Sequence, residues 1–207
     1  SKGILDLWDI RFAVLIRSWS FGNHLPITGL ALYPPMSKKH ERNIVVVGGV
    51  SNSILTVWDV SKPHCREIVM DSESEPSMNE LVAIEKDLDR LGFVGEKFTN
   101  RTSCLEVDGY KILVADSQEN EIIYFDFKSK ASSKVILGPK VDKYRFKTIQ
   151  VTANTSVTLK QKNLEQALDS DYSCLHHDTI NAIATVRTLQ KPLIVSADNS
   201  GVINIYR

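Results

Sequence analysis

The sequence predicts an all-β protein built from repeated four-stranded antiparallel sheets, and three observations support this fold class. Four segments alternate apolar with polar or small residues and end in an aromatic residue, and a period of two is typical of β-strands. In three cases a second apolar run and a tight polar turn precede the segment, which predicts a hairpin. A further strand is expected before each hairpin, and another after the aromatic residue.

The recurring aromatic residues mark the third strand of each expected sheet. They are Trp8, Trp58, Phe125 and Tyr206, and the first three are followed by Asp9, Asp59 and Asp126. Together the patterns predict thirteen strands, at residues 3–9, 13–19, 27–32, 44–49, 53–59, 66–70, 103–107, 112–115, 120–126, 134–137, 180–186, 193–197 and 201–207.

A four-stranded unit that ends in Trp-Asp is typical of a WD-repeat β-propeller blade, whose period is about 40 to 45 residues. Trp8 and Trp58 are 50 residues apart, Trp58 and Phe125 are 67 apart, and Phe125 and Tyr206 are 81 apart. The last two units must therefore contain insertions, which we place at residues 71–101 and 139–173. Both follow an outer strand and precede the next inner strand.

The thirteen expected strands make two complete blades and parts of two others, which cannot close a ring. We therefore expect residues 1–207 to form the C-terminal half of a WD-repeat β-propeller, in a ring of about seven blades whose first half lies N-terminal to this sequence. A chance truncation is the alternative.

Composition argues against several classes of function. Lys plus Arg and Asp plus Glu both number 25, so no overall positive field favours nucleic acid as a ligand. No apolar run approaches the roughly 20 residues that span a bilayer, and residues 1–10 lack a signal-peptide pattern. The three widely spaced cysteines argue against disulfides and zinc, which favours a reducing, cytosolic setting.

No motif in the sequence predicts an enzyme, a metal site or a cofactor site. Gly48-Gly49 lacks the lysine and the helix of a phosphate loop. His176-His177-Asp178 has no third ligand or nucleophile at a suitable spacing, so we expect a loop in which His176 contacts the neighbouring hairpin turn. An enzyme using a central channel is the alternative, but the expected inner strands are mainly apolar or small.

The closing stretch carries a specific resemblance. Residues 176–207, with His176-His177-Asp178, Ser196 and the ending Val-Ile-Asn-Ile-Tyr206-Arg207, resemble the C-terminal blade of the vacuolar protein sorting-associated protein fifteen family. Members of that family are the kinase-like regulatory subunits of class III phosphatidylinositol 3-kinase. The resemblance is close over about 32 residues and is one of layout only in the preceding repeats.

This resemblance implies a non-catalytic scaffold in vesicular protein sorting to the vacuole or lysosome and in autophagy. The implied partners are the class III phosphatidylinositol 3-kinase catalytic subunit and its accessory autophagy and sorting subunits. The implied location is cytoplasmic and peripheral on endosomal, Golgi and autophagic membranes, with membrane contact made only through the parent complex. A serine/threonine-protein-kinase-like domain would lie outside this sequence. The alternative is a propeller like the G-protein β subunit that binds a G-protein α subunit.

WD repeats often contain a buried network of His, Ser or Thr, Trp and a turn Asp, and here that network is degraded. At the turn position the sequence has Asn52, Glu119 and Ser200, and at the serine position it has Gly48, Ala115 and Ser196. Only the last repeat combines a histidine, His176, with that serine. We therefore expect these repeats to depend mainly on apolar burial.

The first insertion predicts a helix. Ser77-Met-Asn-Glu80 forms a capping box, and Gly92 offers a stop. An apolar stripe follows the cap at helical spacing, namely Leu81, Ile84, Leu88 and Leu91. The stripe packs on the protein's own surface or binds a partner. Residues 71–91 contain seven acids and two bases, so the exposed face is expected to be acidic.

The second insertion is basic and predicts an extra hairpin around residues 144–151 and 156–159. Residues 138–162 contain one acid, Asp142, and six bases, namely Lys140, Lys143, Arg145, Lys147, Lys160 and Lys162. Both insertions should emerge on one face of the disc, so we expect them to lie side by side and partly neutralise each other. The alternative is that Lys140, Lys143, Arg145 and Lys147 contact acidic lipid headgroups or an acidic partner.

Overall fold

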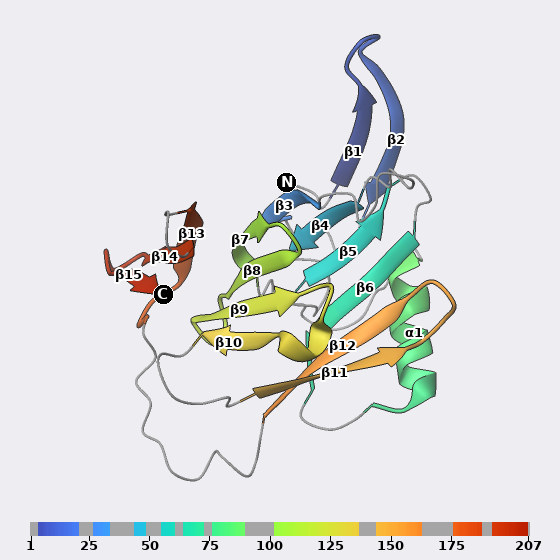
Figure 1. Ribbon diagram of the computed structural model, residues 1–207. Helices are drawn as coiled ribbons and strands as arrows, with labels where there is room; N and C mark the ends of the chain where they lie inside the picture. Colours follow the sequence, from blue (N-terminus) through green and yellow to red (C-terminus); the bar gives the residue numbers. More distant parts are fainter. Residues whose placement is uncertain are drawn as a thin grey trace.

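The described part of the chain consists mostly of β-strands (Figure 1). The structure is a computed structural model that describes residues 4–20, 27–33, 44–48, 55–60, 64–72, 76–89, 102–136, 144–162, 176–187 and 192–206. Within these residues each of the thirteen expected strands is present, with ends that differ from the expected ends by at most two residues.

Two sheets contain the complete four-stranded antiparallel unit that the repeat predicts. The first consists of β3 (Gly29–Tyr33), β4 (Ile44–Gly48), β5 (Leu55–Asp59) and β6 (His64–Asp71). The second consists of β7 (Thr102–Asp108), β8 (Lys111–Asp116), β9 (Glu121–Asp126) and β10 (Lys134–Ile136). Gly109 and Asn120 have positive φ in the turns of the second sheet, so these turns use residues that tolerate the left-handed region.

The two ends of the chain form partial sheets. At the N-terminus β1 (Ile4–Asp9) pairs with β2 (Val14–Ser20). At the C-terminus three antiparallel strands follow one another, namely β13 (Ile180–Arg187), β14 (Pro192–Asp198) and β15 (Ile203–Tyr206). The order of strands in each partial sheet matches the corresponding part of the complete unit.

The two insertions add regular structure outside the repeat (Figure 1). The first contains α1 (Met78–Asp89) and the second contains a hairpin of β11 (Tyr144–Gln150) and β12 (Ser156–Lys162). β12 pairs in parallel with β6, so the hairpin extends the first sheet to six strands with β11 at its edge. A short 3-10 turn, η1 (Lys130–Ser132), precedes β10.

The contact between neighbouring sheets repeats from one sheet to the next. The Thr28 hydroxyl, just before β3, donates to the carbonyl of Thr102 at the start of β7. The Ser103 hydroxyl of β7 donates to the carbonyl of Ile180 at the start of β13. Thr28 lies one residue before β3 and Ser103 is the second residue of β7, and each acceptor is the first residue of the next unit's first strand. In both cases a hydroxyl near the start of one unit therefore contacts the start of the next unit.

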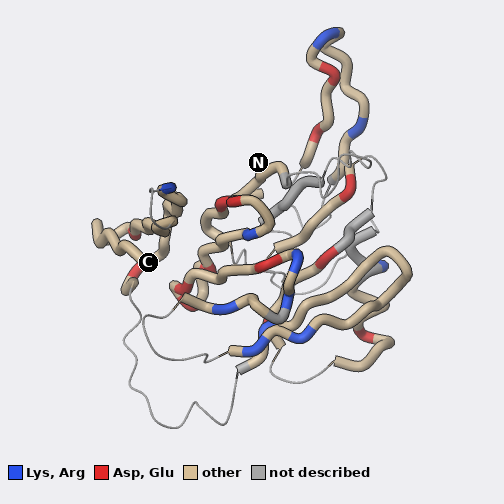
Figure 2. Tube along the Cα trace, in the orientation of Figure 1, with Lys and Arg blue, Asp and Glu red and all other residues tan. Residues whose placement is uncertain are grey.

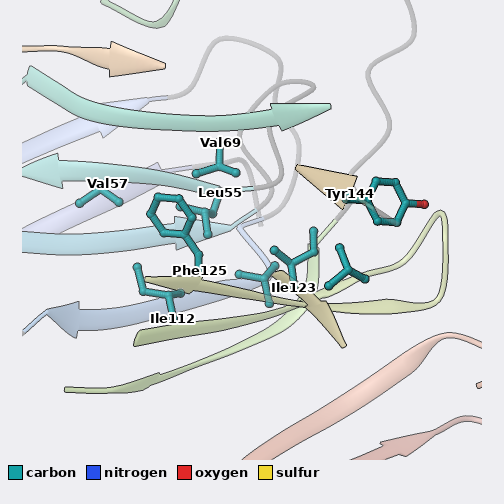
Figure 3. Close-up of a cluster of buried hydrophobic side chains, with 9 residues drawn as sticks. Leu55, Val57, Val69, Ile112, Ile123, Phe125 and Tyr144 are labelled. Atoms are coloured by element: carbon teal, nitrogen blue, oxygen red, sulfur yellow. The ribbon is translucent and has the colours of Figure 1, made fainter. Parts of the chain in front are cut away.

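A buried apolar cluster joins the first and second sheets (Figure 3). Phe125 is completely buried and lies among Val57 and Val69 of the first sheet and Ile112 of its own. The cluster takes alternate residues from its strands, such as Leu55 and Val57 of β5 or Ile123 and Phe125 of β9. One face of each sheet therefore contributes to the cluster. Tyr144 from the inserted hairpin extends this core beyond the repeats.

Gly29 makes the close approach of β3 to β7 possible. A Cβ atom at this position would lie 2.5 Å from Leu105 Cδ2 and 2.6 Å from Leu105 Cγ. We expect Gly29→Ala to lower the free energy of unfolding by about 1–3 kcal/mol, because the overpacked core must shift Leu105 or separate the strands. Thermal denaturation checks this, and the double variant Gly29→Ala/Leu105→Ala should recover part of the loss. No loss in the single variant would contradict the prediction.

Candidate interaction platform

The helix of the first insertion packs on β6 and on the hairpin that the second insertion adds to the six-stranded sheet, and we call α1 together with the β11–β12 hairpin the insertion platform (Figure 1). The helix begins as the sequence predicts, because Ser77 and Glu80 form a capping box. The backbone N–H of Ser77 donates to Glu80 Oε2 at 2.7 Å, and the backbone N–H of Glu80 donates to Ser77 Oγ at 3.4 Å. The helix ends at Asp89, and Gly92 lies outside the described residues.

The apolar stripe of α1 turns toward the protein itself. Leu81 is completely buried in a cluster with Ile68 of β6 and with Val157 and Leu159 of β12, and Ile84 packs at its margin. Leu81 therefore has no exposed surface to offer a partner. The side chain of Leu88 and all of Leu91, the other two residues of the predicted stripe, lie outside the described residues.

The hairpin is sandwiched between α1 and the second sheet, which explains the alternation along β12. Val157 and Leu159 face the helix, whereas Ser156, Thr158 and Lys160 face the second sheet. On β12 the described residues of both faces are buried, and Ser156, Thr158 and Lys160 bind carboxylates of neighbouring strands. The outer strand β11 keeps Arg145 and Lys147 exposed.

Glu67 is the centre of the first of two buried ionic clusters that hold the hairpin in place. Its side chain is 1% exposed and accepts hydrogen bonds from Ser156 Oγ at 2.5 Å and Thr158 Oγ1 at 2.6 Å. Lys130 of η1 also forms an ion pair with it. One carboxylate on β6 thus binds both the inserted hairpin and the turn before β10. A charge-assisted cluster of this kind is stronger than neutral hydrogen bonds.

Lys160 is the centre of the second buried ionic cluster. Its ammonium group lies 3.1 Å from Glu121 Oε2, 3.7 Å from Asp71 Oδ1 and 3.9 Å from Asp116 Oδ2, and its side chain is only 1% exposed. The ammonium also lies 4.3 Å from the centre of the Tyr144 ring. Lys160 therefore links the hairpin to the second sheet and to the end of β6.

Tyr144 completes the cluster around Lys160. Its hydroxyl donates to Glu121 Oε1 at 3.2 Å. Burial raises the pKa of Tyr144 well above its usual value, and the nearby Glu121 carboxylate raises the pKa further. The phenol therefore stays protonated and remains a hydrogen-bond donor at neutral pH.

The predicted basic residues differ in their exposure to solvent. Arg145 and Lys147 are exposed on β11, whereas Lys160, counted among the six bases of this segment, is buried and paired. Lys140 and Lys143 lie outside the described residues. The two insertions do lie side by side, but their contact combines apolar packing with an ion pair between the buried Lys160 and Asp71, whose side chain is 34% exposed. Both residues were expected to contribute exposed charge.

The four repeat aromatics have unequal surroundings. Trp58 and Phe125 are buried, Tyr206 is partly buried, and Trp8 is 52% exposed on its two-stranded sheet. The aspartates that follow them also differ. Asp9 pairs with Arg11, Asp59 is buried, and Asp126 accepts the backbone N–H groups of Lys128 and Ser129.

The last sheet contains a buried polar network. His176 Nδ1 lies 2.9 Å from Asp198 Oδ2, and His176 Nε2 lies 2.6 Å from Ser196 Oγ, which donates to the Tyr206 hydroxyl at 3.2 Å. His176 thus contacts the hairpin turn, as the sequence predicts. The acidic residue of this network is Asp198. Alignment of the repeats on their aromatic residues instead places Ser200 at the turn position where WD repeats usually have an aspartate. Ser200 is a donor to Asp198, with Oγ at 2.7 Å.

One sequence feature that occurs in two units points to Asp198. Both Ala115-Asp116 and Ala197-Asp198 end the second strand of their units, and both aspartates are buried. No comparable signal predicts Glu67 or Lys160, because neither occupies a repeated position. The triad-like order of Ser196, His176 and Asp198 resembles a hydrolytic site, but Ser196 and His176 are each 1% exposed, so no substrate reaches them.

The Asp198 carboxylate should make stability depend on pH. The hydrogen bond from Ser200 is the main cause that lowers the pKa of Asp198 well below its usual value, and His176 and the Val202 N–H add to it. A carboxylate with a lowered folded pKa stabilises the fold above about pH 4, and this contribution is lost as the pH falls toward the folded pKa.

We therefore expect Asp198→Asn to flatten the loss of stability on acidification below about pH 4, while lowering stability at neutral pH. Thermal denaturation between about pH 2 and pH 7 measures both effects. The exposed Asp178 provides the matched control as Asp178→Asn. Equal acid dependence in the two variants would contradict the assignment.

No group of three or more His, Cys, Asp or Glu among the described residues is arranged to hold a metal ion. No helix in the described ranges is long and apolar enough to cross a bilayer.

Comparison with known proteins finds relatives along the whole chain. The serine/threonine-protein kinase VPS15 of Saccharomyces cerevisiae is 40% identical over 207 residues. A non-specific serine/threonine protein kinase of Candida glabrata is 31% identical over 99% of the chain, and VPS15 of Arabidopsis thaliana is 23% identical. No protein-family profile matches the chain. The chain spans only 14% of the length of the two yeast relatives.

Proposed function

Because the chain is homologous to VPS15 over its whole length, we propose that it is a non-catalytic scaffold region of a class III phosphatidylinositol 3-kinase complex. Its role is to hold the lipid kinase catalytic subunit together with the accessory subunits of sorting and autophagy. The observation that carries this proposal is the 40% identity along all 207 residues. The scaffold acts in sorting to the vacuole or lysosome and in autophagy, on endosomal, Golgi and autophagic membranes that the parent complex contacts.

We propose that residues 1–207 form the C-terminal half of a WD-repeat β-propeller. The repeated hydrogen bond from Thr28 to Thr102 and from Ser103 to Ile180 supports this, because a constant step between sheets is what a ring requires. Large apolar side chains are exposed on both partial sheets, such as Ile16 at 59% and Ile203 at 66%. These faces suit further sheets of the same kind.

The insertion platform is the candidate partner-binding surface of this scaffold. Burial of Leu81 restricts the available part of α1 to its outer face, which includes Ala83 and Lys86. On the hairpin, Arg145 and Lys147 are exposed. The buried clusters around Glu67 and Lys160 support a binding role, because they make the platform rigid before any partner arrives.

Co-purification tests the proposed function. In the full-length protein, removal of residues 1–207 should reduce recovery of the lipid kinase catalytic subunit or an accessory subunit by about tenfold, while the remaining protein is still expressed. Undiminished recovery of every subunit would contradict the scaffold role. The double substitution Ala83→Arg/Lys86→Glu then tests whether the outer face of α1 binds a partner. It keeps α1 in place, so the apolar surface beneath the helix stays covered.

A further inference from the structure

β11 is the edge strand of the six-stranded sheet among the residues that the structure describes. Among the described strands none pairs with β11 on the side away from β12. The strand is seven residues long and contains neither proline nor glycine. Every second residue of an edge strand directs its N–H and C=O away from the sheet, so the edge offers hydrogen-bonding groups to an added strand.

The edge is also held rigidly. On one face of the hairpin the Glu67 and Lys160 clusters bind β12 to β6 and to the second sheet. On the other face Val157 and Leu159 pack beneath Leu81 of α1. An added strand would therefore meet a preformed template, and little conformational entropy of the template would be lost on binding.

The charge of β11 selects the kind of strand that can pair with it. Arg145 and Lys147 are exposed and lie two residues apart, on the same face of the strand. The strand has no acidic residue, and Figure 2 shows no red along it. Opposite charges directly across two strands stabilise their pairing, whereas like charges oppose it. A second copy of β11 is therefore disfavoured as the occupant, and a strand with Asp or Glu at alternate positions is favoured.

We infer that β11 is a docking site for an extended, acidic segment of a partner protein, which adds to the sheet as a seventh strand. The backbone of β11 supplies the ladder of hydrogen bonds, and Arg145 and Lys147 pair with carboxylates at alternate positions of the incoming segment. This inference deepens the proposed function and rests on it, since it names the chemistry by which the platform holds a partner.

Peptide binding to the full-length protein tests the inference. The probe is a blocked, fluorescent peptide about seven residues long that alternates glutamate with threonine or valine. Fluorescence anisotropy should show saturable binding, and Arg145→Glu/Lys147→Glu should weaken it by about tenfold or more. The matched control Lys128→Glu/Lys134→Glu changes the charge equally at exposed lysines outside β11, and should leave the affinity within about twofold.

A second probe separates strand addition from simple charge attraction. The same peptide with N-methylated amides at alternate positions keeps its carboxylates but loses the donors that a ladder needs, so it should not bind. Equal binding of both peptides, equal loss in the control variant, or no binding at all would overturn the inference. Preferential binding of phosphatidylserine vesicles that depends on Arg145 and Lys147, without peptide binding, would also overturn it.

Failure of this test and failure of the proposed function are distinguishable. Suppose that Arg145→Glu/Lys147→Glu leaves peptide binding unchanged, while removal of residues 1–207 still releases the lipid kinase subunits. In that case only the proposed role of β11 is wrong. If the subunits remain bound after that removal, the scaffold role itself is wrong.

Discussion

Lys160→Ala is expected to lower the free energy of unfolding by about 3–5 kcal/mol, although the residue belongs to an insertion and not to a repeat. Its removal leaves the buried carboxylates Glu121 and Asp116 without their cation, and an uncompensated buried charge is far more costly than a lost surface pair. The free energy of opening of β8, β9 and β12, measured by native-state hydrogen exchange in the full-length protein, gives the size of the effect.

Two further variants make the Lys160 prediction specific. Lys147→Ala removes an exposed lysine from the same hairpin and should change stability by less than about 0.5 kcal/mol. Lys160→Met/Glu121→Gln removes one charge of each sign and should recover part of the loss, because well-packed neutral groups can replace a buried ion pair. Equal effects of Lys160→Ala and Lys147→Ala would show that the ionic cluster contributes nothing.

Phe125→Ala is expected to cost about 3–5 kcal/mol, because the side chain is completely buried where the two complete sheets meet. The substitution removes a large apolar volume that Val57, Val69 and Ile112 surround, and rigid strands on both sides limit collapse of the cavity. Hydrogen exchange of β5 and β9 amides should report the loss in both sheets together.

The matched control for Phe125 is Tyr110, an aromatic residue of the same sheet that is 38% exposed. Tyr110→Ala should cost less than about 1 kcal/mol, which includes the loss of its contact with Lys128. If Phe125→Ala destabilised only the second sheet and left β5 unchanged, the shared core between the sheets would be refuted.

The strands and the helix were predictable because their signals are local. Alternation of side chains predicts a strand wherever one face is buried, and the thirteen expected strands are present among the described residues. The Ser77–Glu80 capping box is complete within four consecutive residues, so the start of α1 needs no distant contact. The inserted hairpin was expected on the same basis.

The strand with which the inserted hairpin pairs was not predictable from the local sequence pattern. Residues 139–173 follow β10 in sequence, yet β12 pairs in parallel with β6, about 90 residues earlier. Parallel pairing depends on which sheet edge is accessible after the repeats have assembled. For the same reason the count of basic residues in the segment wrongly predicted that Lys160 is exposed. Lys160 is buried because the carboxylates of Glu121, Asp116 and Asp71 surround its ammonium group.

By itself the sequence determined the repeated strand order, the capped helix, the extra hairpin and the resemblance to the VPS15 family. Only the tertiary structure decided which aromatics are buried, that Leu81 packs inward, that Asp198 and not Ser200 binds His176, and that β11 is the edge strand among the described strands. The physical reason is the sequence separation of the residues that interact. Backbone periodicity and capping act within a few residues, whereas burial and charge pairing depend on residues that the fold brings together from distant parts of the chain.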